Sequence, residues 1–416
     1  MRQRMFRVLV ESTLVAALGL CLLSLASGVR PGNAGPAPGP STNVAGDVNG
    51  DGLVNITDGV YLFQYLFQNG APPVACAGGS GLTLEQEAIL ATMSLLEVDD
   101  GSGSNTNTTL QISGVNVRIV NGSGMTSVSS GTGNLIVGYN SGTTGATGSH
   151  NVVVGDGHDY TSYGGVVLGS DNRICGPYAC VTGGTLNEAS GVASSVTGGR
   201  QNVALGQTAS VSGGILNQAT GLHASVSAGS SNVASGFAAT VSGGTSNTSS
   251  GSASAVSGGQ SNQATGSTGS DATSVSGGSG NIASGLACSV TGGSLNTATG
   301  VASSVAGGTG NTASGSSSSV AGGFANGAAG TQCAISGGSQ NSSTGSACVV
   351  VGGSGNTASA SGSIFAATVV GGTVNQATGD RSVVVGGQNN QASGLTAVVG
   401  GGLGVTVSTA HACSCN

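Results

Sequence analysis

A pattern of apolar and polar positions with a period of fifteen residues runs through most of the chain. Its clearest copy is Val181–Gly191, which reads V-T-G-G-T-L-N-E-A-S-G, and a near copy begins at Val196. The apolar residue that opens each copy falls at Val181, Val196, Val211, Val226, Val241, Val256, Val275, Val290, Val305, Val320, Ile335, Val350, Val369 and Val384. Insertions of four residues precede Val275 and Val369. A fixed period of this length predicts a repeat architecture.

The repeat predicts two short strands, because alternate residues of an extended backbone share a face. We number its positions from the opening valine, which is position 0. Small residues at −2, valine at 0, asparagine at +6 and alanine at +8 are expected to point inward together with the glycine at +10. Serine and threonine at −1 and +1, and the variable residues at +7 and +9, are expected to point outward. The Gly-Gly pair at +2 and +3 and the glycine at +10 are expected in turns, where glycine adopts positive φ without strain.

One such coil cannot bury its own apolar face, whereas stacked coils can, with equivalent residues about 4.8 Å apart. The inward asparagines, from Asn187 to Asn390, are then expected to form a ladder whose amides bond along the axis. The fold class we predict is all-β, a parallel β-roll or β-solenoid with coils of fifteen residues over 134–406, regular from 166. Because its core is thin and made of small residues, we expect the rod to associate with copies of itself.

The form V-S-G-G-x-x-N-x-A-S-G resembles the head repeat of the trimeric autotransporter adhesins, the YadA-like head, over roughly Asn134–Thr406. The resemblance implies a left-handed β-roll and a homotrimer that attaches to a surface, matrix or carbohydrate. We find no amphipathic strands at the C-terminus that would form an integral membrane anchor, so we do not expect anchoring by the usual route of this family.

A candidate calcium loop lies near the N-terminus, at Asp47–Asp58, D-V-N-G-D-G-L-V-N-I-T-D. Oxygen-bearing side chains fall at loop positions 1, 3, 5, 9 and 12, the spacing with which EF-hand loops surround Ca²⁺. The loop is similar to that of dockerin modules, and this similarity implies the ligands Asp47, Asn49, Asp51, Leu53 (through its carbonyl), Asn55 and Asp58. An apolar helix is expected to follow at Gly59–Asn69. An Asx-rich surface turn is the alternative interpretation.

The remaining N-terminal segments have simpler interpretations. Met1–Gly28 has a basic start and an apolar run and is expected to be a secretory signal peptide, so the protein is expected to be secreted or held at the cell surface. The other expected segments are a Pro/Gly linker (29–45), the calcium-loop module (46–70), a second linker (71–82), a short helix (83–98), a strand and connector (99–133) and a cysteine-containing tail (407–416).

The short helix is predicted over Thr83–Glu97, with Thr83 and Gln86 as a capping box and Ile89, Met93 and Leu96 on one stripe. It packs either on its own chain or with two other copies in a bundle. Alternation of apolar residues predicts a strand over Leu110–Val120.

Composition excludes several functions. The chain has no lysine, only 6% charged residues and a net charge of −7, so we expect no binding to nucleic acid. The few titratable residues after Val166 fall at different positions of the repeat, so nothing converges as an active site requires, and we expect no enzyme activity.

Histidine and cysteine suggest further sites. His150, Asp156, His158 and Asp159 form either a metal site or ordinary turn residues. Cys288, Cys333 and Cys348 occupy the small inward position −2 and are interpreted as core residues, whereas Cys175, Cys180, Cys413 and Cys415 are better candidates for disulfides of undetermined pairing.

Three functions remain compatible with this sequence. The first is an adhesin-like rod with one calcium loop. The second is ice binding, because serine and threonine at −1 and +1 would make two regular columns of hydroxyl groups. The third is a passive extracellular spacer. Valines at outward positions near the ends of the rod, such as Val349 and Val351, suggest extra apolar surface for packing between chains.

Overall fold

The computed structural model describes residues 57, 60, 61, 63, 64, 93–99, 106–112, 116–266, 272–360 and 366–415. The chain forms two units, Met1–Val117 and Arg118–Asn416.

The first unit contains a β-hairpin. Strand β1 (Met93–Asp99) pairs antiparallel with β2 (Thr106–Ile112), with Met93 opposite Ile112 and Asp99 opposite Thr106. The prediction of a helix over Thr83–Glu97 is therefore wrong from Met93 onward. The apolar residues of M-S-L-L-E-V-D fit a short strand as well as a helix, and pairing with a threonine-rich partner decides between them.

Of the strand predicted over Leu110–Val120, Leu110–Ile112 belong to β2, and 113–115 lie outside the described residues. Asn116–Val120 belongs to no strand, and Val117, Ile119 and Val120 are exposed. Alternation alone does not make a strand, because the backbone needs a partner.

The residues described nearest to the N-terminus, Thr57, Val60, Tyr61, Phe63 and Gln64, are helical. Four of them fall within the helix expected over 59–69. Val60 and Phe63, expected on its apolar side, are 52% and 53% exposed.

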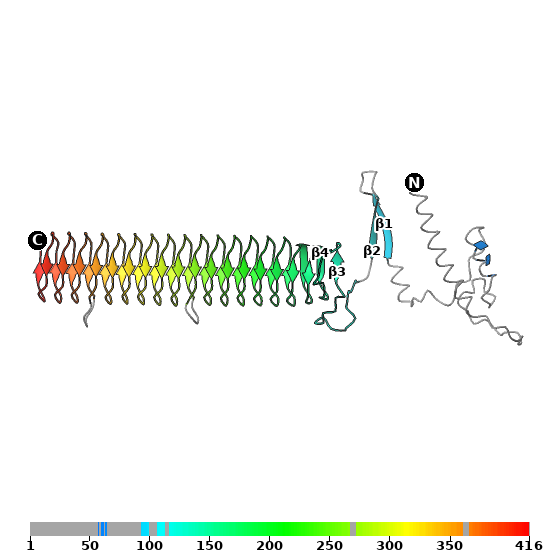
Figure 1. Cartoon of the computed structure of the whole chain (residues 1–416), viewed down its shortest axis with the longest axis horizontal. Coiled ribbons are helices and arrows are strands. Elements are labelled where there is room, and N and C mark those ends of the chain that lie inside the picture. Colours follow the sequence, from blue (N-terminus) through cyan, green and yellow to red (C-terminus); the bar gives the residue numbers. More distant parts are fainter. Residues whose placement is uncertain are drawn as a thin grey trace. The chain divides into compact units, whose positions relative to one another are not determined.

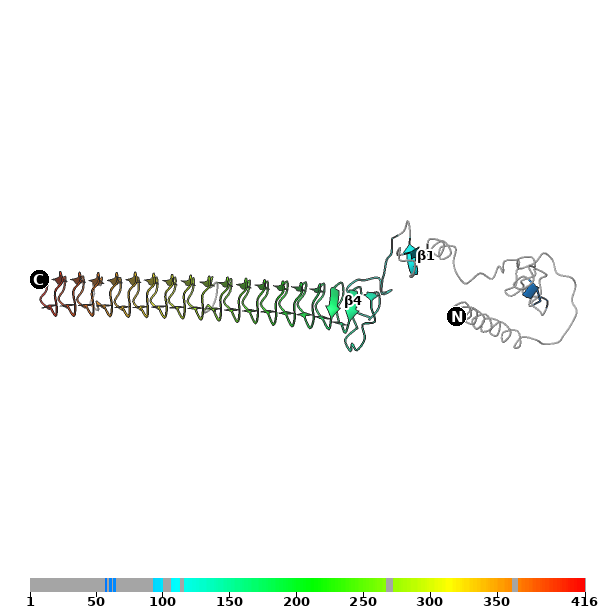
Figure 2. The same ribbon diagram turned by 90° about the horizontal axis from the view of Figure 1, so that it is seen from above.

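The second unit is a parallel β-solenoid of about 18 turns, whose coils lie side by side along one axis (Figures 1 and 2). Its first ladder contains β3 (Leu135–Val137), β4 (Val152–Asp156), β6 (Val166–Ser170), β8 (Cys180–Val181), β10 (Ser195–Val196), β12 (Ser210–Val211), β14 (Ser225–Val226), β16 (Thr240–Val241), β18 (Ala255–Val256), β20 (Ser274–Val275), β22 (Ser289–Val290), β24 (Ser304–Val305), β26 (Ser319–Val320), β28 (Ala334–Ile335), β30 (Val349–Val350), β32 (Thr368–Val369), β34 (Val383–Val384), β36 (Val398–Val399) and β38 (Cys413–Ser414).

The second ladder contains β5 (Asp159–Tyr160), β7 (Arg173–Ile174), β9 (Glu188–Ala189), β11 (Val203–Ala204), β13 (Gln218–Ala219), β15 (Val233–Ala234), β17 (Thr248–Ser249), β19 (Gln263–Ala264), β21 (Ile282–Ala283), β23 (Thr297–Ala298), β25 (Thr312–Ala313), β27 (Gly327–Ala328), β29 (Ser342–Ser343), β31 (Thr357–Ala358), β33 (Gln376–Ala377), β35 (Gln391–Ala392) and β37 (Thr406–Val407). A line of single bridges at position +4, from Ser170 and Thr185 to Gln388 and Leu403, ties the coils together at a third place.

Equivalent residues pair throughout the regular repeat, as Val196 does with Val211 and Ala204 with Ala219. The register survives both insertions, since Val256 pairs with Val275 across the first of them. This confirms the predicted stacking of identical positions.

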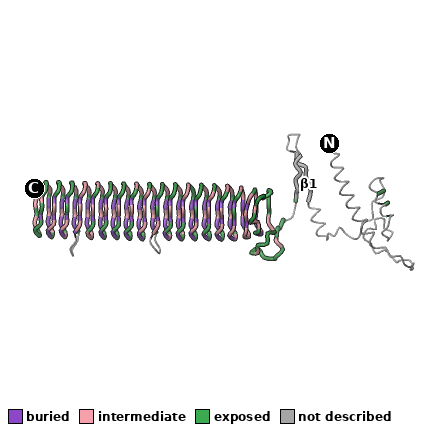
Figure 3. The backbone as a smooth tube through the Cα atoms, in the orientation of Figure 1, coloured by how far each residue is buried: buried purple, intermediate pink, exposed green. Residues whose placement is uncertain are grey.

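Side chains face as the repeat predicts. In the regular coils, positions −2, 0, +6, +8 and +10 are buried and +1 is exposed, so that buried and exposed stretches alternate along the backbone (Figure 3). The valines and alanines of successive coils form one continuous core. Because each side chain packs on the equivalent side chain of the next coil, small side chains suffice to exclude water from the core.

The glycines act differently from the prediction. The second glycine of each pair has positive φ, as in Gly184 (81°). The glycine at +10, as in Gly191, does not, except Gly266 (59°) before the first insertion. A Cβ on Gly191 would instead collide with the carbonyl oxygen of Gly206 in the next coil. Further positive φ values fall on ordinary residues at +5 and +12, such as Leu186 (58°) and Ala193 (52°). Where a regular coil follows directly, glycine at +10 is therefore required by the close approach of two backbones; Ala360 takes this position before the second insertion.

The solenoid continues past Thr406, where the repeat was predicted to end. Cys413 pairs with Val398, and Ser414 with Val399, so the residues predicted as a tail form part of a further coil. Val405 takes the place of the asparagine there, and its N–H donates to the Asn390 Oδ1 at 2.8 Å. This coil lacks the asparagine of the motif but still stacks on the coil before it.

Candidate functional surface

The outward positions of the first ladder form two columns of small polar residues. Position +1 is exposed and carries Thr182, Thr197, Ser212, Ser227, Ser242, Ser257, Ser276 and Thr291 in successive coils. Position −1 is half-buried and carries mostly serine or threonine. Near the C-terminal end valine replaces them, and Val351 and Val385 are 46% and 47% exposed. The face therefore changes from hydroxyl-bearing to apolar along its length.

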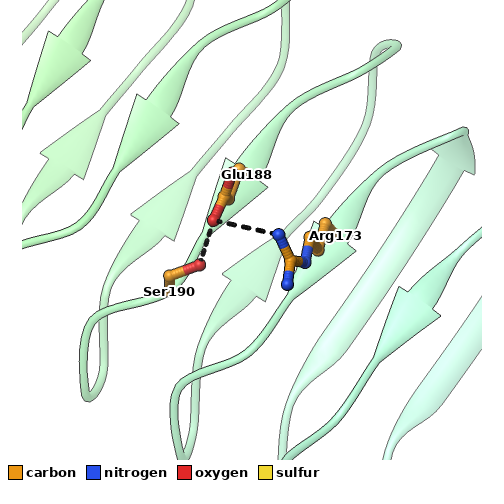
Figure 4. Close-up of polar contacts among 3 residues, drawn as sticks. All are labelled: Arg173, Glu188 and Ser190. Atoms are coloured by element: carbon orange, nitrogen blue, oxygen red, sulfur yellow. Dashed lines mark hydrogen bonds and ion pairs between the residues drawn. The ribbon is translucent and has the colours of Figure 1, made fainter. Parts of the chain in front are cut away.

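The outward side of the second ladder contains an ion pair. Arg173 and Glu188 occupy position +7 of consecutive coils, and their side chains approach to 3.7 Å, while the Ser190 hydroxyl also donates to Glu188 (Figure 4). Their exposed fractions are 52% and 31%, so the pair contributes at most about 1 kcal/mol. It leaves no net charge at this place on the face.

The asparagine column is the most regular polar feature of the interior. The Asn217 Oδ1 accepts from the N–H of Asn232 at 3.0 Å, and its Nδ2 donates to the carbonyls of Gly213 (2.8 Å) and Gly229 (2.9 Å). The N–H of Asn217 in turn donates to the Asn202 Oδ1 at 2.9 Å. Each buried amide is thus fully bonded, as the ladder prediction required.

His158 is a member of this column. It is buried, its Nδ1 accepts from the N–H of Asn172 at 3.2 Å, and its Nε2 donates to the carbonyl of Val154 at 3.1 Å. Asn172 makes the equivalent bonds to Asn187 and Leu168. The imidazole therefore replaces an asparagine amide as a structural group.

The proposed metal cluster around this histidine is not assembled. His150 contacts Asn121, the Asp156 carboxylate accepts from Ser141, and Asp159 accepts from the N–H of Gly145 at 3.0 Å. No three histidine, cysteine, aspartate or glutamate side chains are grouped to hold a metal ion anywhere in the described residues. The four residues are turn and ladder residues because each is committed to a neighbouring backbone group.

Asp156 provides a pH-dependent contact. The backbone N–H and hydroxyl of Ser141 donate to its carboxylate and hold its pKa below the ordinary value of 3.8. The contact is therefore complete above pH 3.8 and is lost as the pH falls through the lowered pKa.

We expect the protection of the Ser141 amide against hydrogen exchange to fall in this acid range in the natural protein and to stay low at every pH in Asp156→Asn. Asp171→Asn is the control, because its carboxylate contacts Ser170 instead. Equal pH profiles for Asp156→Asn and the natural protein would show that this carboxylate does not hold the turn.

One surface feature was not anticipated from the sequence. Large apolar side chains recur at position +11, in the turn that follows the second ladder, and they are exposed: Val192 (44%), Leu222 (39%), Phe237 (53%), Leu286 (37%) and Val301 (49%). We call these five residues the apolar edge. A row of this kind marks a contact surface more often than scattered apolar residues do. The sequence did contain a signal for this surface, namely an apolar residue that recurs two positions before the small residue at −2 of the next coil.

The cysteines that were favoured for disulfides are thiols in the structure. The sulfurs of Cys413 and Cys415 lie 3.3 Å apart on the exposed last coil, and Cys175 and Cys180 are half-buried. Burial raises the pKa of Cys180.

The calcium-loop ligands Asp47, Asn49, Asp51, Leu53, Asn55 and Asp58 lie outside the described residues. The predicted signal peptide and both predicted linkers (29–45 and 71–82) also lie outside them. Among the residues that are described, no helix has the length and apolar character needed to cross a membrane.

Comparison with known proteins gives no family assignment, since neither a family model nor a curated protein matches this chain.

Proposed function

We propose that the protein is an exported, adhesin-like structural rod that presents a long polar β-solenoid surface for attachment, without catalytic activity. The observation that carries this proposal is the unbroken stack of in-register coils, which repeats the same outward positions many times on a charge-poor surface. Such a surface suits many weak, repeated contacts with a solid surface, an extracellular matrix or a carbohydrate. The resemblance of the repeat to YadA-like heads supports the same function and a left-handed roll.

The rod is a homotrimer in this proposal. The apolar edge and the outward valines supply surface that association would bury. The test is the molar mass in solution, by light scattering coupled to size-exclusion chromatography. We expect three times the mass of one chain for the natural protein and a single chain for the double variant Leu222→Ser, Phe237→Ser.

Leu295→Ser is the matched control, because Leu295 is 64% exposed but lies at position +5, in the other turn. It should stay trimeric. A natural protein that runs as a single chain would overturn the trimer, and dissociation by Leu295→Ser alone would move the contact to the other turn.

The N-terminal loop binds one calcium ion in this proposal, through the six ligands inferred from its spacing. Calorimetric titration with calcium chloride should show one site in the natural protein and none in Asp47→Ala, Asp51→Ala. Repeating the molar mass measurement with a chelator separates a role in assembly from a role confined to the N-terminal module. Binding that survives in the double variant would contradict the assignment.

Ice binding is the second candidate, favoured by the column of exposed threonine and serine at +1 with its half-buried neighbour at −1. The replacement of both by valine near the C-terminal end weighs against it. Thermal hysteresis of the purified rod decides between the two, since an ice-binding protein separates the melting and freezing points and an adhesin does not. A rod with neither hysteresis nor attachment to any surface would be a spacer.

A further inference from the structure

Two of the inward cysteines lie directly above one another. Cys333 and Cys348 both occupy position −2, in consecutive coils, and they immediately precede the paired residues Ala334 and Val349. The N–H of Ala334 donates to the carbonyl of Cys348 at 3.0 Å, which fixes the spacing of the two coils at this place. The side chains are 1% and 0% exposed.

Their separation suits a covalent link. The ladder spacing of about 4.8 Å lies within the roughly 4.4–6.8 Å that separates the Cα atoms of disulfide-bonded cysteines. The Cys333 sulfur already reaches into the next coil, where it lies 2.6 Å from the carbonyl oxygen of Gly345. A Cβ on Gly330 or Gly345 would fall 2.7 Å from the sulfur of Cys333 or Cys348, so glycine at these two places leaves the room that the sulfurs occupy.

In the finished coil the two thiols influence one another. The neighbouring Cys348 thiol lowers the pKa of Cys333 to about 6, and the Ser343 hydroxyl acts in the same direction. The same contact raises the pKa of Cys348. At position 343, where most coils have alanine, the serine hydroxyl donates to the carbonyl of Cys348 at 2.9 Å and so lies beside the pair.

We propose that Cys333 and Cys348 form a disulfide that links two consecutive coils of the rod. The geometry carries this inference, because the two thiols are brought together by the register of the ladder and not by a flexible loop.

The reaction is a thiol–disulfide exchange with a small-molecule disulfide such as oxidised glutathione. The Cys333 thiolate attacks one sulfur of the reagent, which breaks the reagent's S–S bond and releases one thiolate. The Cys348 thiolate then attacks the Cys333 sulfur and displaces the second. The two protons lost by the cysteines go to the two released thiolates, so the cysteines are oxidised by two electrons and the reagent is reduced by two. Because both thiols are buried in the finished coil, the exchange takes place while the coils close.

The link has a mechanical consequence. In a solenoid each coil contacts only its neighbours, so the rod separates coil by coil from a weak point. The bond would close a loop of fifteen residues between these coils and prevent their separation.

The test uses the full chain, refolded with a mixture of reduced and oxidised glutathione, acid-quenched, unfolded in guanidinium chloride and treated with iodoacetamide before and after reduction. We expect Cys333 and Cys348 to be protected in the first treatment and alkylated only after reduction, and a proteolytic fragment that joins the two. Cys333→Ala should expose Cys348 to the first treatment. Alkylation of both cysteines before reduction would overturn the proposal, and so would protection of Cys348 in Cys333→Ala.

Cys288 is the internal control, since it is equally buried at position −2 but has Thr273 and Ser303 as its column neighbours. It should be alkylated in the first treatment. A variant with Cys175, Cys180, Cys413 and Cys415 replaced by serine removes the half-buried and exposed cysteines of the other coils and keeps the buried Cys288. In that variant, oxidation should raise the midpoint of urea unfolding, and the rise should vanish when Cys348→Ala is added. An unchanged midpoint on oxidation would mean that no such link forms.

Discussion

Gly221→Ala should destabilise the solenoid strongly, whereas Gly213→Ala should be tolerated. A Cβ on Gly221 would meet the backbone carbonyl of Gly236 in the next coil, and neither backbone can move without breaking the ladder. We expect the free energy of unfolding to fall by about 3 kcal/mol or more. Gly213 lies in the first place of a Gly-Gly pair, with nothing within 4 Å of a Cβ built there and no positive φ. Its replacement should change stability by less than about 1 kcal/mol.

Urea unfolding followed by circular dichroism measures both variants against the natural protein. Both variants add one methyl group to the same coil, so they differ only in the space available to it. Equal stability of the two variants would mean that the coils do not approach one another as closely as the structure describes.

Asn217→Ala should lower the free energy of unfolding several times more than Gln218→Ala, which changes the next residue along the chain. It removes the acceptor of the buried Asn232 N–H and the donor to the half-buried Gly213 carbonyl. Leaving them unpaired, together with the cavity, should cost about 3 kcal/mol or more. Gln218→Ala changes an exposed side chain on the same strand and should cost less than about 1 kcal/mol.

Native-state hydrogen exchange locates the effect as well as measuring it. In Asn217→Ala the amides of the adjoining coils, including that of Asn232, should lose protection first. If Asn217→Ala lowers the free energy of unfolding no more than Gln218→Ala does, the amide ladder adds little to stability. Aspartate at position 217 should be at least as harmful as alanine, because it supplies no donor and buries a charge.

These predictions depend on the part of the fold that the sequence specifies best. The period of fifteen residues, the inward set and the bonding of the asparagines follow from alternation on a strand, repeated so often that local ambiguity averages out. Val196 and Asn202 were placed correctly for that reason. Isolated segments have no such redundancy, and the helix predicted through Glu97 is instead a strand because its partner at 106–112 decides the matter.

The irregular coils show a second limit. The sequence suggested His158 as a metal ligand, because histidine and aspartate are common metal ligands. In the structure it lies fourteen residues before Asn172 and takes the place of an asparagine in the column. Val405 does so at the other end by its backbone alone. Both positions could be recognised only by following the column, since neither residue matches the motif.

The reason for glycine at +10 could not be inferred from the sequence. Sequence reasoning assigned glycine at +10 to a positive φ, but the need arises from a neighbouring coil fifteen residues away. The apolar edge likewise becomes a surface only when Leu222 and Phe237 are stacked at one turn.

The central claim is that the protein is a self-associating rod of in-register coils. Cryo-electron microscopy of the purified full chain tests it most directly. We predict particles with three rods side by side, each with layers about 4.8 Å apart along its axis. Single rods, or chains without a layered repeat, would contradict the account.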